Sequence, residues 1–333
     1  MDTFVDIVFK SQLLISAAGV IMNLFHLIIL LHPRMNISST NSILIGIATC
    51  DLIMLSSIVY DRSSQFFISP IENSCADSEI NTFHHEMSQW IGTFWSNILE
   101  QTPLWLGVFL ALIRLMLMKF PACKDFLSKP AIGYFTVLVT TIITSLMSVY
   151  FYFTMKQNEL EDSWKNGEIC SGTPNESTHT DTQDLERAIH FYVFVSGISQ
   201  ISISLIYPLL TIFLFIEIRK SSSFSTSVLS KKNLLERHRS AKMILVMTVF
   251  YVIYSAPTGF FDFIQLFVYV TPFLAILVEY GSVFVSTLFC LNGMSHSVIN
   301  FFMSSKYRNT LREMLGIKKK VTLIPVSAVS KSS

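Results

Sequence analysis

The sequence predicts an all-α membrane protein, a bundle of seven transmembrane helices with its amino terminus outside the cell. Composition, the length of the apolar segments and the placement of positive charge support this prediction. Of the 333 residues, 51% are hydrophobic and 14% are charged, whereas a soluble domain carries about 25% charged residues. The mean hydropathy of +0.51 agrees with a lipid environment. A net charge of +1 gives no electrostatic attraction to nucleic acid, which is therefore not an expected partner.

Seven segments are apolar over about 20 residues or more, the length needed to cross the hydrocarbon core of a bilayer. Their apolar residues run on without the alternation of barrel strands, so each is predicted to be a helix. The predicted spans are Ser11–Leu31, Asn41–Tyr60, Trp90–Met118, Ala131–Phe153, Ile189–Ile216, Met243–Tyr269 and Tyr280–Met303. They divide the chain into an extracellular segment 1–10, a seven-transmembrane domain 11–303 and a cytoplasmic tail 304–333.

Lysine and arginine gather in alternate loops. One set of loops holds only five of the 24, namely Lys10, Arg62, Lys156, Lys165 and Arg187. Loops rich in lysine and arginine stay in the cytosol, so the amino terminus is predicted outside and the carboxyl terminus inside. The first ten residues, MDTFVDIVFK, are too acidic for the start of a secretory signal, and the first helix is expected to be retained.

The predicted outside loops hold two cysteines and a glycosylation sequon. Cys75 and Cys170 fall in the first and second outside loops, on the oxidising side of the membrane. They form a natural disulfide pair that would tie the second loop to the mouth of the bundle; the alternative is two free thiols. Asn175-Glu176-Ser177 is an N-glycosylation sequon in the same second loop.

Three stretches carry a resemblance to a known family: NLFHLIILLHPRMNISSTNSILIGIATCDLIML, PLWLGVFLALIRLMLMKFP and LNGMSHSVINFFMSSKYRNTLREML. The chain resembles rhodopsin-like G-protein-coupled receptors, and more narrowly the nematode serpentine chemoreceptors of class W, which are similar to receptors for short FMRFamide-type neuropeptides. The resemblance covers nearly all the chain. It implies a plasma-membrane receptor that binds an outside ligand and activates a cytosolic heterotrimeric G protein. The most specific positions are Asn23, His26, Pro33, Met35, Ser39, Asn41 and Asp51.

Asp51 is an acid in the middle of the second predicted helix. A carboxylate there needs a cation, a proton or several hydrogen-bond donors. The resemblance implies that Asp51 lies with Asn23 and Asn292 in a polar cluster that binds a sodium ion and reorganises on activation. The alternative is a protonated, hydrogen-bonded structural aspartate. Sodium at Asp51 is the one cofactor that the sequence suggests.

Arg114 closes the third apolar run, ALIRLMLMKFP. The resemblance implies that it is the arginine of the Asp/Glu-Arg-Tyr motif, which meets the G protein in the active state. Ile113 and Leu115 replace the acid and the tyrosine of that motif. The arginine therefore lacks its usual carboxylate, which would raise basal activity or leave another group to hold it. The alternative is a positive charge that only ends the helix at the membrane surface.

Glu100 and Gln101 precede Arg114 on the same predicted helix, and at 1.5 Å per residue Glu100 lies about 21 Å nearer the outside. An outside ligand would arrive at that depth. We expect Glu100 to contact a basic or amide-bearing ligand group, with Asp262 of the sixth helix as its companion. The alternative is an interhelical hydrogen bond to a tyrosine or a serine. Acids outnumber bases in the second outside loop, which favours a short basic peptide first and a small odorant or amine second.

The sixth and seventh helices hold the expected switch residues. Pro257 is predicted to kink the sixth helix and let its cytosolic half swing. The family usually places a tryptophan where this chain has Ser255. By position, His296 and Asn300 replace the first asparagine and the tyrosine of Asn-Pro-x-x-Tyr.

Two further segments are predicted to form the docking face for the G protein. Beyond the seventh helix, SSKYRNTLREML predicts a short amphipathic helix on the membrane surface. A basic run precedes the sixth helix, with Lys231, Lys232, Arg237, Arg239 and Lys242. The alternative is that these basic flanks merely follow the charge rule for cytosolic loops.

Other classes of protein fit less well. Gly197-Ile198-Ser199-Gln200 matches the short G-x-S-x pattern of intramembrane proteases, with His296 as a base, but no other signature accompanies it, so no enzyme is predicted. The HHEMSQ stretch is not the zinc motif H-E-x-x-H, and no metal site is predicted. A transporter or channel is a remote alternative, because internal duplication is absent from the sequence and ionisable residues along any path are few.

Overall fold

The structure is a computed structural model that describes residues 2–67, 87, 96–166, 182–224, 231–267 and 271–316. The helices in these ranges are α1 (Asp2–Leu31), α2 (Ser39–Phe67), α4 (Ser96–Lys119), the 3-10 turn η3 (Pro121–Cys123), α5 (Lys124–Leu127), α6 (Pro130–Asn166), α7 (Thr182–Phe224), α8 (Lys231–Gln265), α9 (Pro272–Met303) and α10 (Ser305–Met314). The described part of the chain contains no strand, so the all-α class is confirmed.

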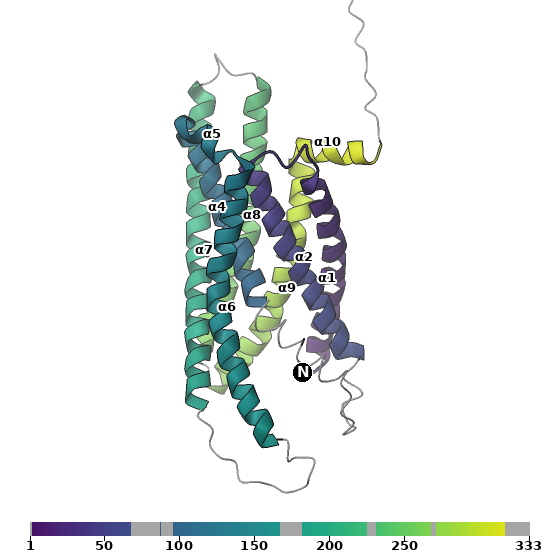
Figure 1. The fold of residues 1–333 in the computed structure, drawn as a ribbon, viewed down its shortest axis with the longest axis vertical. Coiled ribbons are helices and arrows are strands. Elements are labelled where there is room, and N and C mark those ends of the chain that lie inside the picture. The colour runs from purple at the N-terminus through teal and green to yellow at the C-terminus, as the bar shows by residue number, and fades with distance from the viewer. Residues whose placement is uncertain are drawn as a thin grey trace, which may run out of the picture.

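The long helices pack side by side into one bundle, and α10 lies across one end of it (Figure 1). We call this the α10 end; α1 begins at the opposite end. The core of the bundle holds large, fully buried side chains, including Tyr207 of α7 and Tyr251 and Tyr254 of α8. One cluster of buried hydrophobic residues reaches from Ile29 of α1 to Ile299 of α9, so the core joins helices far apart in the sequence.

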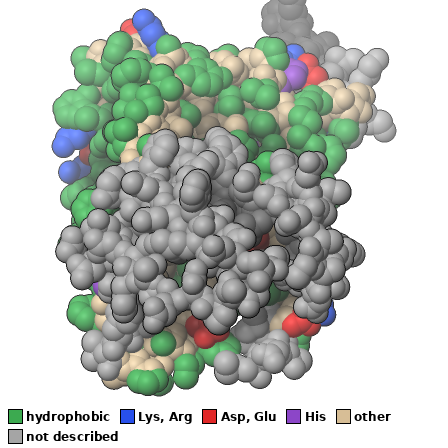
Figure 2. All heavy atoms as spheres, turned by 60° about the horizontal axis from the view of Figure 1, so that its bottom comes forward, with side chains coloured by type: hydrophobic (Ala, Val, Ile, Leu, Met, Phe, Trp, Pro, Cys, Tyr) green, Lys and Arg blue, Asp and Glu red, His purple; other side chains and the backbone are tan. Residues whose placement is uncertain are grey.

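Six of the described helices are long and apolar enough to cross a membrane: Asp6–Leu31, Ser39–Ser63, Ile98–Lys119, His190–Lys220, Lys242–Gln265 and Pro272–Met303. A shorter apolar stretch, Pro130–Leu146, lies within α6. Large hydrophobic side chains cover the sides of these helices, and charged side chains are few among the described residues on the face that Figure 2 shows. Leu14 is 72% exposed and Phe135 is 64% exposed. Such a surface is costly in water and is stable in lipid.

Several helix boundaries differ from the sequence prediction. The predicted start of the first helix at Ser11 is wrong, because α1 already begins at Asp2. The predicted start of the seventh helix at Tyr280 is also wrong, because α9 begins at Pro272. Thr271 caps α9 by accepting a hydrogen bond from the Leu274 backbone N–H, and proline suits the first helical position because its missing N–H has no partner there. The apolar span of α9 also begins at Pro272, so the capping signal and the hydropathy agree on this start.

The other long helices extend past the predicted spans, and one ends early. α6 runs to Asn166, and α7 spans Thr182–Phe224, because backbone hydrogen bonds continue where the apolar run stops. α8 ends at Gln265, before the predicted Tyr269. The short helix predicted after the seventh span is present as α10. Cys75, Cys170 and Asn175 lie outside the described residues.

Candidate functional site

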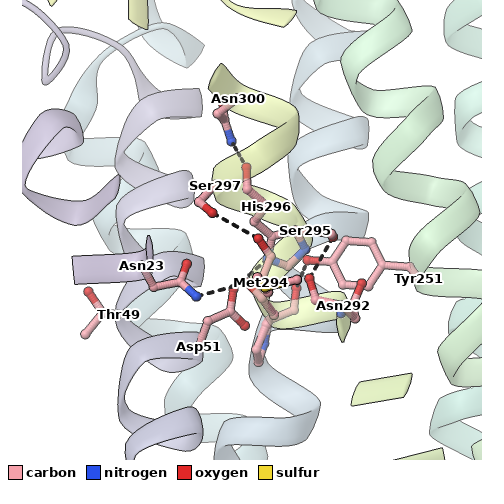
Figure 3. Close-up of polar contacts among 12 residues, drawn as sticks. Asn23, Thr49, Asp51, Tyr251, Asn292, Met294, Ser295, His296, Ser297 and Asn300 are labelled. Carbon is pink, nitrogen blue, oxygen red and sulfur yellow. Dashed lines mark hydrogen bonds and ion pairs between the residues drawn. The ribbon is translucent and has the colours of Figure 1, made fainter. Parts of the chain in front are cut away.

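Asp51 of α2 and His296 of α9 meet in the centre of the bundle (Figure 3). The Nδ1 atom of His296 lies 2.5 Å from the Oδ2 atom of Asp51, and each residue is 1% exposed. The ring of His296 also packs against the ring of Tyr251, with centroids 5.2 Å apart. Two helices that are distant in the sequence are therefore joined by a buried polar contact, and a third helix supports the imidazole.

Asn23 and Asn292 lie beside this pair, as the resemblance implied (Figure 3). The Nδ2 atom of Asn23 donates a hydrogen bond of 3.0 Å to the backbone oxygen of Gly293. The Oδ1 atoms of Asn23 and Asn292 are buried without a hydrogen-bond partner among the described residues. Asn300 lies one turn nearer the α10 end, where its Nδ2 atom donates to the backbone oxygen of His296 at 2.8 Å. Asn300 therefore contacts its own helix.

This cluster does not fit a sodium ion bound to Asp51. The Oδ2 atom of the carboxylate is already in contact with the imidazole, so this oxygen is not free to coordinate an ion. No group of three or more His, Cys, Asp or Glu residues in the described chain could hold a metal ion. Asp51 is therefore in contact with His296 in this structure.

Arg114 lies toward the α10 end of α4, where Thr40 of α2 holds it. Its Nη2 atom donates to the Thr40 hydroxyl at 3.2 Å, and its Nε atom is buried without a partner. No carboxylate among the described residues pairs with it. The neutral hydroxyl of Thr40 thus binds Arg114, whereas in the family motif an acid at the position of Ile113 would do so. One neutral hydrogen bond holds a charged group less firmly than an ion pair with two hydrogen bonds would.

Glu100 lies farther from the α10 end, in a network between α4, α7 and α8. Its Oε1 atom accepts hydrogen bonds from the hydroxyl of Tyr254 and, at 3.4 Å, from the Nε2 atom of Gln200. This geometry matches the interhelical hydrogen bond to a tyrosine that the sequence left open. The carboxylate is therefore satisfied within the protein.

Gln101 and Asp262 belong to a second chain of hydrogen bonds beside the first. Trp105 Nε1 donates to Ser199 at 3.0 Å, and Ser199 donates to Gln101 Oε1 at 2.8 Å. Gln101 Nε2 donates to Ser196 at 3.2 Å, and Ser196 donates to Asp262 Oδ2 at 2.8 Å. All three predicted pocket residues thus lie at the α4, α7 and α8 contact.

Pro257 lies inside α8, the helix that contributes Tyr251 to the Asp51 cluster and Tyr254 to the Glu100 network. Ser255, which stands in place of the family's tryptophan, is fully buried and lies 2.7 Å from the Ser204 hydroxyl of α7. A direct hydrogen bond between α7 and α8 therefore replaces the bulky ring at this point. The smaller side chain leaves the two helices in close contact next to the proline.

The α10 helix is fastened to α1 and to the turn that follows α1. The Tyr307 hydroxyl lies 3.1 Å from Nδ1 of His26, and Tyr307 is 3% exposed. Arg34 and Glu313 form an ion pair on the surface. Burial raises the pKa of Tyr307 to about 12, so its hydroxyl stays neutral at physiological pH. These contacts fix α10 across the end at which Arg114 lies.

A seven-helix bundle with these intramembrane polar groups is matched by a family model described as serpentine type 7TM GPCR chemoreceptor Srw, over residues 10–318. The chain belongs to this family. A search of the curated proteins finds no match. The protein is therefore a G-protein-coupled chemoreceptor, a multi-pass protein of the plasma membrane and not an enzyme. The prediction of a serpentine chemoreceptor from the sequence is confirmed.

Sequence reasoning missed four partners that define the receptor's polar contacts: Thr40, Ser196, Tyr254 and Tyr307. Each is a hydroxyl-bearing residue within or beside an apolar helix. The hydroxyls of Thr40, Ser196 and Tyr254 face a charged or amide-bearing residue of another helix. A search for hydroxyl residues at the same depth as Arg114, Glu100 and Asp262 would have found three of them.

Proposed function

We propose that the receptor binds a ligand from outside the cell and activates a heterotrimeric G protein at its α10 end, which faces the cytosol. The observation that carries this proposal is the state of Arg114: half-buried, with one neutral hydroxyl partner among the described residues, at the end of the bundle where α10 lies. The excess of lysine and arginine in the same loops and tail supports the orientation. The family match supports the coupling to a G protein.

Activation requires only that the ligand and the G protein favour the same state of the bundle. Breaking the single Arg114–Thr40 hydrogen bond would free the guanidinium for the G protein. Movement of α8 about Pro257 would open the space between the helices at that end. Both changes are local. The first breaks a contact between α4 and α2, and the second alters the contacts of α8 with its neighbouring helices.

A short basic peptide is our first choice of ligand. Such a ligand would agree with the resemblance of the chain to rhodopsin-like receptors for FMRFamide-type peptides. The acidic predicted second loop and the acids Glu100 and Asp262 would attract its positive charge. A disulfide between Cys75 and Cys170 would hold that loop over the bundle, and Asn175 would carry a glycan. The second choice is a small environmental molecule. The cavity beside Gln101 favours this choice because its volume is only about 200 Å³.

The test is G-protein activation in a heterologous cell, with a panel of short amidated peptides and a panel of small odorants and amines. Glu100→Gln and Asp262→Asn are compared with wild type at equal surface expression. A peptide response that weakens in both variants supports a peptide receptor with an acidic pocket. A response to odorants alone supports the second choice. A solute flux in cells without G-protein signalling, with no response to either panel, would overturn the proposal.

A further inference from the structure

A cavity of about 200 Å³ lies between α4, α6 and α7, beside the hydrogen-bonded chain that ends at Asp262. Gln101 and Trp105 of α4, Thr144 and Ser148 of α6, and Ser196 and Ser199 of α7 contribute to its lining, but most of the surface that faces the cavity is apolar. None of the nine described residues that line it is charged. A cavity of this kind does not suit an ion, an amino acid or a peptide with charged ends.

The cavity reaches the lipid-facing surface between α6 and α7. Ile143, which lines it, is 60% exposed, and Leu146, one turn along α6, is 64% exposed. On the facing helix, Phe191 is 51% exposed and Phe194 is 45% exposed. These exposed apolar side chains lie in the apolar stretch Pro130–Leu146 of α6 and in the apolar span His190–Lys220 of α7, where lipid would cover them. A molecule dissolved in the lipid can therefore enter without passing through the outside loops.

The inner wall offers hydrogen bonds to one polar group. Ser199 donates to Gln101 and accepts from Trp105, and its oxygen can accept one further hydrogen bond. Drug-sized ligands occupy pockets of roughly 300–1,000 Å³, so this cavity fits a smaller molecule. We propose that the cavity binds a small, mainly apolar molecule with a single hydroxyl or carbonyl group, delivered from the bilayer.

The same wall connects the cavity to α8. Ser199, Gln101, Ser196 and Asp262 form a continuous chain of hydrogen bonds from the cavity to the helix that contains Pro257. A ligand hydroxyl that donates to the remaining acceptor site of Ser199 would polarise that chain, and a ligand carbonyl would compete with Gln101 for the Ser199 proton. Occupation of the cavity would thus favour one position of α8. This output, unlike binding itself, rests on the proposed function of G-protein activation.

The test is photolabelling of the full-length receptor in lipid nanodiscs with a diazirine-bearing medium-chain alkanol, followed by mapping of the labelled residues. We expect labelling within α6 and α7 around the cavity that unlabelled alkanol competes away. Val195→Trp, which fills the cavity, should abolish the competed labelling. Thr144→Leu, a smaller change that should fold if the tryptophan variant does not, should reduce it. Leu146→Trp, which alters the lipid-facing surface outside the cavity, should leave it unchanged.

Labelling spread evenly over the lipid-facing helices, or competed labelling that survives Val195→Trp and Thr144→Leu, would overturn the site. Binding is measured without a G protein, which keeps the two proposals apart. Competed labelling without any G-protein activation in cells would leave the cavity site standing and overturn the proposed function. Activation by peptides with no competed labelling would support the proposed function and overturn the cavity site.

Discussion

His296 of α9 and Asp51 of α2 form a buried pair, with 2.5 Å between Nδ1 and Oδ2. Both belong to positions at which the family resemblance implies a switch, yet the resemblance gives no reason to pair them. The replacement of asparagine by histidine at this position brings a basic group to the one buried acid of α2. The contact links α2 directly to α9, and Asn23 adds α1 through Gly293.

Removing the imidazole should destabilise the receptor. His296→Ala leaves the buried Asp51 side chain without its hydrogen-bond partner, which costs about 1–3 kcal/mol. We expect a clear fall in the thermal unfolding temperature of the purified receptor in detergent. Phe284→Ala, on the same helix but 58% exposed, is the control and should have little effect. Equal unfolding temperatures for His296→Ala and Phe284→Ala would refute the structural role of the pair.

The same pair predicts insensitivity to sodium. A ligand that binds only the folded state stabilises it in proportion to the logarithm of its concentration above the dissociation constant. Since His296 already contacts the carboxylate, exchanging choline chloride for sodium chloride at constant ionic strength should leave wild-type stability unchanged. His296→Asn removes the basic group and should make stability rise with sodium. Sodium-dependent stabilisation of wild type would show that Asp51 binds the ion after all.

Gly133 allows α6 to approach the start of α2. A Cβ atom there would lie well inside van der Waals contact with the backbone oxygen of Ser39. Ser39 is itself held by hydrogen bonds to Ser128 and Leu127, so the backbone cannot easily move away. Gly133→Ala should therefore cost about 1–3 kcal/mol, as overpacking does.

Gly293→Ala is the matched control, because its Cβ would meet only ordinary contacts of 3.6 Å and more. Thermal unfolding and surface expression are the readouts for both variants. If Gly133→Ala is as stable as Gly293→Ala, the close contact between α2 and α6 is absent from the folded receptor.

The attachment of α10 depends more on Tyr307 than on the surface ion pair. Tyr307→Phe leaves a buried nitrogen of His26 unpaired, which costs about 1–3 kcal/mol. Glu313→Gln breaks an exposed ion pair with Arg34 and should cost about 0–1 kcal/mol. Hydrogen exchange of the α10 amides should increase strongly in Tyr307→Phe and little in Glu313→Gln. The opposite order would show that the ion pair is the main attachment. Tyrosine ionisation contributes only in alkaline solution, because the pKa of Tyr307 is about 12.

The sequence predicts the helices and their polar residues well, because spanning length and intramembrane charge leave local signatures. Glu100, Gln101 and Asp262 were grouped by depth, and the structure places them in adjoining networks between the same helices. Depth along a helix follows from the rise per residue. The rise per residue does not give the rotation of each helix about its axis. The sequence therefore does not predict that Asp51 and His296 face each other.

The start of α9 differs from the prediction although its first residues are apolar. The apolar span itself begins at Pro272, and the cap at Thr271 marks the same start. The partner of Arg114 was missed for a different reason. The sequence leaves another group to hold the arginine but does not identify it, because that group, the hydroxyl of Thr40, lies on another helix.

Whether Thr40 restrains Arg114 can be measured as nucleotide exchange on a heterotrimeric G protein by equal amounts of purified full-length receptor, without ligand. Thr40→Ala removes the one hydrogen bond that the described residues give Arg114, worth about 1.5 kcal/mol for a charged donor, and should raise basal exchange about tenfold. Ser38→Ala removes only the neighbouring hydroxyl contact to Thr40 and should match wild type. Adding Arg114→Ala to Thr40→Ala should abolish the exchange. Undiminished exchange by that double variant would show that Arg114 does not engage the G protein.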